Sequence, residues 1–442
     1  MKYQKILKGL SFYLQRSPKL WKFAVTIFEI KVFNPSRVKY KKSTSYESVY
    51  QISDTKYNII FDAQCLQTQT RQRGIGTFSL KFIKAVCAEK PNSTFAAVLT
   101  TICSFEDLAI AKAALENLKC SNLDILILDP FNGSRKVSFH HARNSIRETL
   151  ESMECHSLIS LSPFEKHRST ISIPKSKSYT RIAILYDLIR LVYPKQFLFS
   201  RSQRSSFEWS LGELKQYDLL LSISNETKKH WSKLIGDEPP IYIVHGGSDA
   251  KKYISQINFH ERRGVLCIGA EQPHKNLERL ISAYSQIPIS LQLDHPLTIL
   301  GIRSKGTKAR LAKLARKAYG EVNFPDYLDS HELNNRYEKA RILVMPSLIE
   351  GLSLPIFEAW SHGLVVIASG GTVADELIND SKLTFDPYSP PEIAKKIEEF
   401  LTSESGWNEA REKSIIRAKI YTWPKTANLA LQAVKDFVND EN

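Results

Sequence analysis

The sequence has few cysteines, and none of them form closely spaced pairs. Its six cysteines are scattered through 442 residues without a Cys-x-x-Cys pattern. This spacing argues against a structural zinc site or a disulfide framework and fits a reducing cytoplasm. The sequence also lacks a run of eighteen apolar residues, so we predict no transmembrane helix. An uninterrupted apolar segment followed by a small-residue cleavage site is missing near the beginning, so we expect no secretory signal peptide.

The sequence does contain enough apolar residues for large hydrophobic cores. Apolar residues make up 43% of the chain, which argues against extensive disorder. A length of 442 residues exceeds what one core usually organises, so we expect two domains.

The positive charge of the chain is concentrated at one end. Residues 1–42 contain eleven lysines and arginines and a single acid, so they carry +10 of the formal net charge of +15. Aromatic residues are interleaved with these bases, which suits an anionic membrane surface. A solvated tail with a few packed rings and a nucleic-acid-binding tail are the alternatives. We favour the membrane surface, expect no nucleic-acid partner, and predict a peripheral protein at the cytoplasmic face of the plasma membrane.

From residue 57 onward, short apolar segments alternate with amphipathic helical patterns. This alternation predicts parallel sheets that are covered by helices on both faces. Two such sets, separated near residues 250–262, predict an α/β fold of two Rossmann-like doubly wound domains. The predicted strands are 57–63, 123–129, 181–187, 217–224, 241–247, 264–270, 297–301, 341–347 and 364–369, and the predicted helices include 274–287 and 307–320.

A glycine-containing loop follows the first predicted strand, at the end where parallel sheets bind ligands. Arg71 and Arg73 precede Gly74 and Gly76, and a helix is expected to begin at about Gly76. Glycines let backbone N–H groups approach a ligand, and a helix N-terminus beside two arginines favours an anion. The third glycine of the dinucleotide fingerprint is missing, so an ordinary tight turn is an equal alternative.

Two more polar residues follow predicted strands. Lys275 lies at the start of a helix, where a cation opposes the helix dipole unless it faces an anion, so a phosphate contact is one interpretation. His245 lies in a His-Gly-Gly turn, and we expect it to be structural rather than catalytic.

Residues 350–363 place two carboxylates around the mouth of one helix. Glu350 lies in the loop after a predicted strand, Pro355 suits the first helical turn, and Glu358 falls one turn inside. The N–H groups of residues 352–354 can bind phosphate, and the carboxylates can accept hydrogen bonds from hydroxyl groups. A nucleotide sugar offers both kinds of group. The alternatives are the acid and nucleophile of a glycosidase, and a Glu358 that only complements the helix dipole.

The Glu350-x7-Glu358 spacing resembles the E-x7-E signature of retaining GT-B glycosyltransferases of family 4. Further segments resemble this family in matching order across nearly all of residues 57–430, among them ILYDLIRLVYP, SISNETKKHW and IGAEQPHKNLERLISAY. The combination with YDLI and VYP most resembles mannosyltransferase-like members that build surface polysaccharides.

The resemblance implies two domains that face a cleft, with the acceptor on the first domain and the nucleotide sugar on the second. Glu358 would bind the ribose hydroxyls, Glu350 would contact the donor sugar, and Lys275 would stabilise the diphosphate. Asp187 would line the cleft near the transferred sugar. The other implied donor-binding residues are Ser353, Leu354, Gly74, Gly76, Gly269, His274 and Arg73.

The same resemblance gives the domain boundaries. We predict a basic, aromatic-rich segment over residues 1–55 and an acceptor domain over 56–255. The nucleotide-sugar domain is predicted over 256–420, and a C-terminal helix over 421–442 is expected to return to the acceptor domain.

The sequence departs from the family at four positions, one of which is Arg190, where proline is frequent. Tyr186 stands where many members have histidine, and Ala270 stands where many have arginine. Part of the diphosphate charge then lacks its usual partner, and His274 or Arg73 would compensate. Ser353 replaces a usual glycine and would tighten the phosphate loop. A catalytically silent, sugar-nucleotide-binding partner of another glycosyltransferase is therefore the alternative function.

The resemblance also implies the reaction. We predict a retaining hexosyltransferase that moves a hexose, with mannose favoured, from a GDP- or UDP-linked donor to a glycan or lipid-linked glycan. In the front-face displacement ascribed to the family, the leaving diphosphate accepts the proton of the acceptor. No metal or other cofactor is expected.

Overall fold

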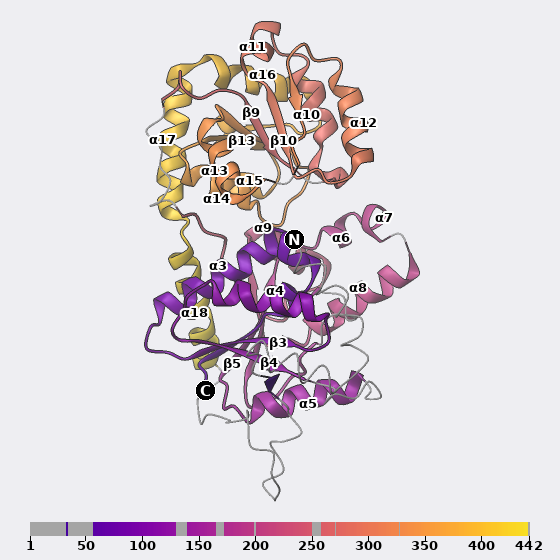
Figure 1. The fold of residues 1–442 in the computed structure, drawn as a ribbon, viewed down its shortest axis with the longest axis vertical. Helices are drawn as coiled ribbons and strands as arrows, with labels where there is room; N and C mark the ends of the chain where they lie inside the picture. The colour runs from indigo at the N-terminus through magenta and orange to yellow at the C-terminus, as the bar shows by residue number, and fades with distance from the viewer. Residues whose placement is uncertain are drawn as a thin grey trace, which may run out of the picture.

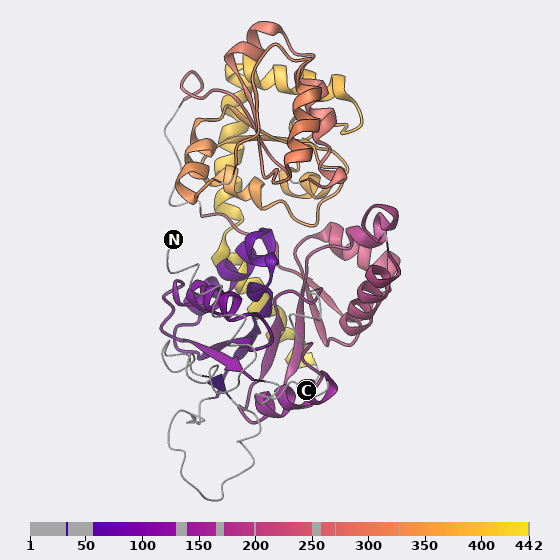
Figure 2. The same ribbon diagram turned by 45° about the vertical axis from the view of Figure 1, so that its right-hand side comes forward.

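The computed structural model describes residues 32–33, 56–129, 139–164, 172–198, 200–249, 258–269, 271–326 and 328–440. Most of the basic segment and Ala270 fall outside these ranges, as does the predicted boundary between residues 255 and 256. The predictions made for those positions therefore stay predictions. Two α/β domains are stacked along the long axis of the molecule (Figures 1 and 2). The predicted fold class of two doubly wound, Rossmann-like sheets is confirmed for the described residues.

The first domain is built on a parallel sheet with the strand order β1-β4-β3-β2-β5-β6-β7-β8. Side chains of alternate strand residues point to opposite faces of the sheet and pack in different cores. Phe61 packs in one core with Phe78 of α3 (Gly74–Glu89), whereas Ile60 packs in another with Ile146 of α5 (Phe139–Glu151). Both faces are therefore covered, as the apolar strands predict. The strands are β1 (Val32–Phe33), β2 (Ile59–Asp62), β3 (Phe95–Thr100), β4 (Leu123–Leu128), β5 (Ser157–Ser160), β6 (Thr180–Leu185), β7 (Leu219–Ser222) and β8 (Ile241–Ile243).

The remaining helices of this domain surround the same sheet. They are α4 (Phe105–Glu116), α6 (Ile189–Val192), α7 (Pro194–Phe197), α8 (Arg201–Leu214) and α9 (Asn225–Leu234). The hydroxyl of Ser224 accepts a hydrogen bond from the N–H of Thr227 and so caps α9, because that N–H has no partner inside the helix. The cap brings the start of α9 to the carboxyl end of β7.

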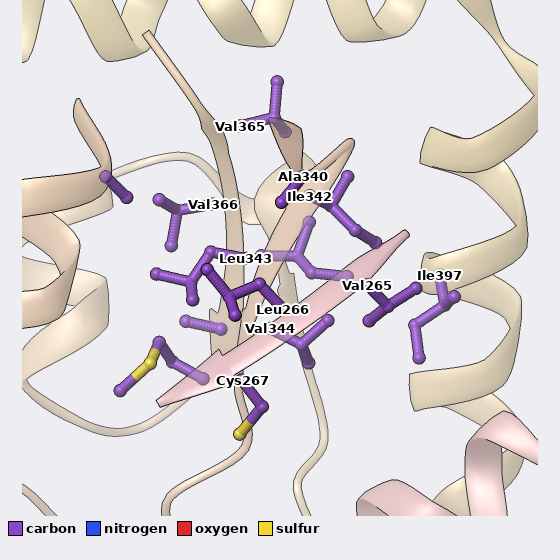
Figure 3. Packing of buried hydrophobic residues seen from close by; sticks show 14 of the residues in the cluster. Val265, Leu266, Cys267, Ala340, Ile342, Leu343, Val344, Val365, Val366 and Ile397 are labelled. Carbon is purple, nitrogen blue, oxygen red and sulfur yellow. The ribbon is translucent and has the colours of Figure 1, made fainter. Parts of the chain in front are cut away.

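The second domain holds a parallel sheet with the order β11-β10-β9-β12-β13-β14. Figure 3 shows the buried side chains of its three central strands, together with Ile397 of a covering helix. The strands are β9 (Val265–Ile268), β10 (Leu297–Leu300), β11 (Val322–Asn323), β12 (Ile342–Met345), β13 (Val365–Ser369) and β14 (Thr384–Phe385). The helices are α10 (Leu277–Tyr284), α11 (Ile289–Asp294), α12 (Lys305–Ala315), α13 (Ser330–Lys339), α14 (Leu354–Ser361), α15 (Val373–Ile378), α16 (Pro390–Thr402) and α17 (Glu404–Ile420).

Three predicted helix boundaries are wrong. The pattern at 274–287 is divided into a 3₁₀ turn, Pro273–Lys275, and α10, because Asn276 adopts a left-handed conformation with φ of +57°. The Asn276 side chain explains the break, since its amide donates to Pro346 O at 3.0 Å and Pro387 O at 2.8 Å. The helix predicted over 307–320 is shorter and begins earlier, as α12, and α3 begins at Gly74 rather than Gly76.

The chain crosses between the two domains twice, and the crossings lie side by side. The N–H of Ser248 donates to Tyr421 O at 2.8 Å, and Ser248 forms a parallel bridge with Thr422. A Cβ on Gly247 would lie 2.3 Å from Trp423 N, so only glycine allows this approach. From there α18 (Trp423–Asp440) runs down from the second domain and packs against α3 (Figure 1).

Candidate functional site

The loops at the carboxyl ends of the two sheets meet between the domains. The hydroxyl of Ser224 donates to Gly351 O at 2.7 Å, which links the start of α9 to the loop before α14. A Cβ on Gly351 would lie 2.2 Å from Tyr186 O, so the two loops are in close contact. Glu376 of α15 also accepts a hydrogen bond from Asn225 N at 2.9 Å. These contacts bring the residues singled out in the sequence into one interdomain region.

Lys275 and Glu350 form an ion pair at the centre of this region. Lys275 Nζ lies 2.6 Å from Glu350 Oε1, and both side chains are largely buried. The Ser347 hydroxyl donates to the same oxygen at 2.6 Å. The N–H of Leu348 donates to His274 O at 2.7 Å, which ties the loop after β12 to the turn after β9. The anion that Lys275 faces in this structure is therefore Glu350.

Asp187 approaches the same pair from the first domain. It follows β6, and its Oδ1 accepts a hydrogen bond from Ile189 N at 3.1 Å. Burial raises the pKa of Asp187. The Ile189 hydrogen bond opposes this rise, Glu350 adds to it, and Lys275 opposes it. Asp187 is therefore electrostatically coupled to Lys275 and Glu350, although the three residues come from separate loops.

Glu358 has different partners from Glu350. The Tyr337 hydroxyl of α13 donates to Glu358 Oε2 at 2.6 Å. Burial raises the pKa of Glu358, and the Tyr337 bond and the charge of Lys81 oppose that rise. Burial also raises the pKa of Tyr337 well above its usual value. Nothing in the sequence pattern indicated Tyr337, since it lies on another helix 21 residues before Glu358.

The Ser353 hydroxyl has no hydrogen-bond partner in the described part of the chain. Ser353 is 2% exposed and precedes α14, yet its side chain does not cap the helix. A buried hydroxyl without a partner is costly, which keeps Ser353 a candidate ligand contact at this helix mouth. The Ser353 hydroxyl and the N–H of Leu354, the first residue of α14, thus lie together at the loop that was predicted to bind phosphate.

The first turn of α3, which contains Gly74 and Gly76, lies opposite α14. A Cβ on Gly74 would lie 3.6 Å from Leu354 Cδ1, so this turn faces the first turn of α14 across the interdomain region. Gly76 has a structural role, because a Cβ there would lie 2.4 Å from Arg71 O. Arg71 pairs with Asp107 at 2.7 Å and is therefore already neutralised.

The two residues expected to replace the missing arginine differ in charge. Burial, together with the charge of Lys275, lowers the pKa of His274 to about 4, so its imidazole is neutral at pH 7. The ring packs 5.4 Å from that of Phe197, between centroids. Arg73 is exposed at the start of α3 and forms no ion pair with any described residue. Of the two, only Arg73 brings a charge to this region.

Packing contacts account for the residues at two further predicted positions, Gly269 and Tyr186. A Cβ on Gly269 would lie 2.9 Å from Leu277 Cδ2, so this glycine lets α10 pack close to β9. The ring of Tyr186 lies in the first domain's core, edge-on to Phe78 at 5.5 Å between centroids, and its hydroxyl is 3.5 Å from Ser79 Oγ. Tyr186 therefore turns its ring away from the Lys275–Glu350 pair.

Arg303 was missed by the sequence reasoning. It follows β10, and its guanidinium donates to Gln72 Oε1 at 3.1 Å, beside the start of α3. The backbone N–H of Arg303 donates to Glu271 Oε1 at 2.6 Å. Arg303 therefore adds a cation next to Arg73 at the edge of the interdomain region. No motif marks this position, because the contact depends on how the two domains are placed.

His245 has the conformation and contacts of a structural residue. Its φ is +42°, and its ring packs edge-on against Tyr421 at 5.5 Å between centroids. Burial lowers the pKa of His245, and Glu376, whose Oε1 lies 3.5 Å from Nδ1, opposes this.

No group of three or more His, Cys, Asp or Glu side chains in the described ranges is arranged to hold a metal ion. Within those same ranges, no helix has both the length and the apolar character needed to cross a membrane.

Comparison with known proteins connects this geometry to one family. Residues 249–420 match the model of the family described as glycosyl transferases group 1. The serotype-specific mannosyltransferase WbdA of Escherichia coli is 23% identical over 407 residues, which are 85% of this chain and 47% of WbdA. The O-antigen chain mannosyltransferase B of Escherichia coli is 31% identical over 196 residues, covering 44% of this chain and 51% of that protein. The chain thus spans about half the length of these relatives.

Solved structures share the fold at low sequence identity. Anabaena HepE in complex with UDP and glucose aligns with a TM-score of 0.65 at 13% identity, covering 86% of this chain and all of that one. Sucrose-phosphate synthase from Thermosynechococcus elongatus aligns with a TM-score of 0.61 at 14% identity, covering 87% of this chain and all of that one. Residues 249–420 thus resemble the glycosyl transferases group 1 family, as the sequence motifs predicted, and the chain shares its two-domain α/β fold with these solved structures.

Proposed function

We propose that the chain is a retaining glycosyltransferase that transfers mannose from a nucleotide-diphosphate sugar to a glycan or lipid-linked glycan. The observation that carries this proposal is the separation of the two carboxylates around α14. Glu350 is held by Lys275 and Ser347, whereas Glu358 is held by Tyr337. Separate partners suit contacts with two ends of one extended ligand. A glycosidase instead needs two carboxyl groups that act on the same bond. The two Escherichia coli relatives are mannosyltransferases, which supports mannose as the transferred sugar.

Each group around the cleft then has one task. The carboxylate of Glu358 accepts hydrogen bonds from the ribose hydroxyls, and Glu350 contacts the donor sugar. The N–H groups of residues 352–354 and the Ser353 hydroxyl bind the diphosphate, because N–H groups at a helix N-terminus stabilise an anion. Lys275 is shared between Glu350 and the diphosphate, and Arg73 and Arg303 add positive charge from the loops before α3 and after β10.

The transfer is a front-face displacement. The acceptor hydroxyl oxygen bonds to the anomeric carbon on the face from which the diphosphate leaves. The bond between that carbon and the diphosphate oxygen breaks, and the leaving phosphate oxygen takes the proton of the hydroxyl. The configuration of the sugar is retained. The chain contributes orientation and charge stabilisation, with Asp187 lining the cleft beside the reacting sugar.

Two readouts on the same variants test this proposal. Nucleotide sugars that bind the folded state raise its apparent stability, so melting temperature is measured with GDP-mannose and UDP-glucose. Glu358→Ala is expected to lose most of that stabilisation. Lys275→Ala is expected to lower transfer by about 10²–10³-fold, the cost of removing one stabilising group from a developing charge.

A matched control separates these effects from general destabilisation. Lys413 pairs with Asp380 and Glu409, both at 2.7 Å, outside the interdomain region. Lys413→Ala is expected to keep normal transfer. Near wild-type transfer by both Lys275→Ala and Glu358→Ala would contradict the assignment. Binding of a nucleotide sugar without any turnover by the wild type would identify a catalytically silent partner instead.

We also propose a peripheral position at the cytoplasmic face of a membrane. The support is the charge of residues 1–42 and the aromatic residues interleaved with it. A lipid-linked acceptor would be available at such a surface.

A further inference from the structure

A pocket of about 600 Å³ lies between the two domains and is lined by none of the residues proposed to bind the donor. Its wall includes Tyr193, which lies between α6 and α7 of the first domain, and Leu348 of the loop after β12. The rest comes from the second domain and includes Gly370 after β13, Asp386 and Tyr388 after β14, and Glu392 of α16. A volume of this size is typical of small-molecule sites.

Two tyrosines from opposite domains face each other at this pocket. Burial raises the pKa of Tyr193, and the neighbouring Tyr388 side chain adds to this rise. Tyr388 is 58% exposed, and the guanidinium of Arg279 lies 5.4 Å from its ring centroid. An exposed ring held in this way offers an apolar face beside polar groups, which is the combination that a sugar ring needs.

The charge of the pocket selects the kind of ligand. Asp386 Oδ1 accepts from Tyr388 N at 2.8 Å, and Glu392 Oε2 accepts from Asp386 N at 3.2 Å, so both carboxylates are held in position. Ionised carboxylates accept hydrogen bonds from hydroxyl groups and repel phosphate. The pocket therefore favours an uncharged, hydroxyl-rich ligand over a nucleotide.

The pocket adjoins the proposed reaction centre. Leu348 precedes Glu350 by two residues, and the Asn276 amide, next to Lys275 in the chain, donates to both Pro346 O at 3.0 Å and Pro387 O at 2.8 Å. This side chain holds the pocket wall against the loop that carries Glu350. A ligand in the pocket is consequently next to the Lys275–Glu350 pair.

From these observations we infer that the pocket binds a hexose residue of the acceptor glycan. The inference rests on the proposed glycosyltransferase function and adds a subsite to it. The acceptor would then be held partly by the second domain, through Tyr388 and Asp386, and partly by the first domain, through Tyr193.

Saturation-transfer NMR with methyl α-D-mannopyranoside tests this on the full chain. The wild type is expected to give a saturation-transfer signal that persists when GDP-mannose is added. Tyr388→Ala is expected to lose most of the signal, and Asp386→Asn to weaken it. Tyr319→Ala is the control, because Tyr319 is another exposed tyrosine of the second domain, 71% exposed and outside the pocket.

The outcomes are distinguishable from failure of the proposed function. Absence of signal in the wild type, full signal in Tyr388→Ala, or displacement of the probe by GDP-mannose would each overturn the inference. In transfer assays, Tyr388→Ala is expected to raise the acceptor KM about tenfold without changing the donor KM. An unchanged acceptor KM contradicts the subsite, whereas an inactive wild type that still binds the probe contradicts only the proposed reaction.

Discussion

Replacing Tyr337 by phenylalanine removes one hydroxyl from beside Glu358 and leaves the shape of the ring unchanged. That hydroxyl donates to Glu358 Oε2 at 2.6 Å from a side chain that is 1% exposed. A hydrogen bond to a charged group contributes about 1.5–3 kcal/mol to stability. We therefore expect Tyr337→Phe to lower the free energy of unfolding at pH 7 by about this amount.

The loss in the free energy of unfolding caused by Tyr337→Phe should also depend on pH. Burial raises the pKa of Glu358 in the folded state, and the Tyr337 bond opposes that rise. Tyr337→Phe raises this pKa further. A raised carboxyl pKa destabilises the fold at pH values above it, and this penalty disappears once the group is protonated in both folded and unfolded states. The unfolded state is common to both proteins, so the difference between wild type and variant should shrink as the pH falls through the two raised pKa values of Glu358 in the folded proteins, and should vanish once both folds are protonated.

Urea denaturation at a series of pH values measures this difference. Tyr284→Phe is the matched control, because its buried hydroxyl donates to the carbonyl oxygens of Gln292 at 2.9 Å and His295 at 3.0 Å. Carbonyl oxygens do not titrate, so the control's loss should stay nearly constant with pH. A loss in Tyr337→Phe that is equally independent of pH would refute a charged Glu358 held by this bond.

Three other changes have defined outcomes. Gly76→Ala should lower the free energy of unfolding by about 1–3 kcal/mol through overpacking against Arg71, and a neutral effect in urea denaturation would contradict that contact. Glu376→Gln should loosen the closed interdomain arrangement, because an amide cannot accept from Asn225 and Glu226 with both of its atoms. Small-angle X-ray scattering should then report a larger radius of gyration than in the wild type, and an unchanged value counts against this role. Deletion of residues 1–42 should reduce sedimentation with anionic liposomes, and unchanged sedimentation would remove the basis for membrane binding.

The sequence predicted the fold because its strands are apolar on both faces and its helices are amphipathic. It located the loop at Glu350–Glu358 for the same reason, since parallel sheets place ligand sites at the carboxyl ends of their strands. It misplaced the start of α10, because the left-handed Asn276 is stabilised by carbonyl groups 70 and 111 residues away. Local pattern carries no information about such partners.

The partners of the candidate site residues could not be predicted from the sequence either. Tyr337 and Arg303 reach the site only because of how α13 and the loop after β10 are placed, and neither belongs to a local motif. Tyr186 stands where many family members have histidine, and its ring packs against Phe78 in the core of the first domain. Lys275 was expected to face phosphate, and in this structure it faces Glu350. Side-chain orientation and ion pairing depend on tertiary contacts that spacing alone cannot supply.

The most direct test of the central claim is the NMR analysis of the product that the full chain forms from GDP-mannose and a mannoside acceptor. We expect that GDP is released and that the new glycosidic bond has the same anomeric configuration as the donor. A product of inverted configuration, or release of free mannose in place of transfer, would contradict it.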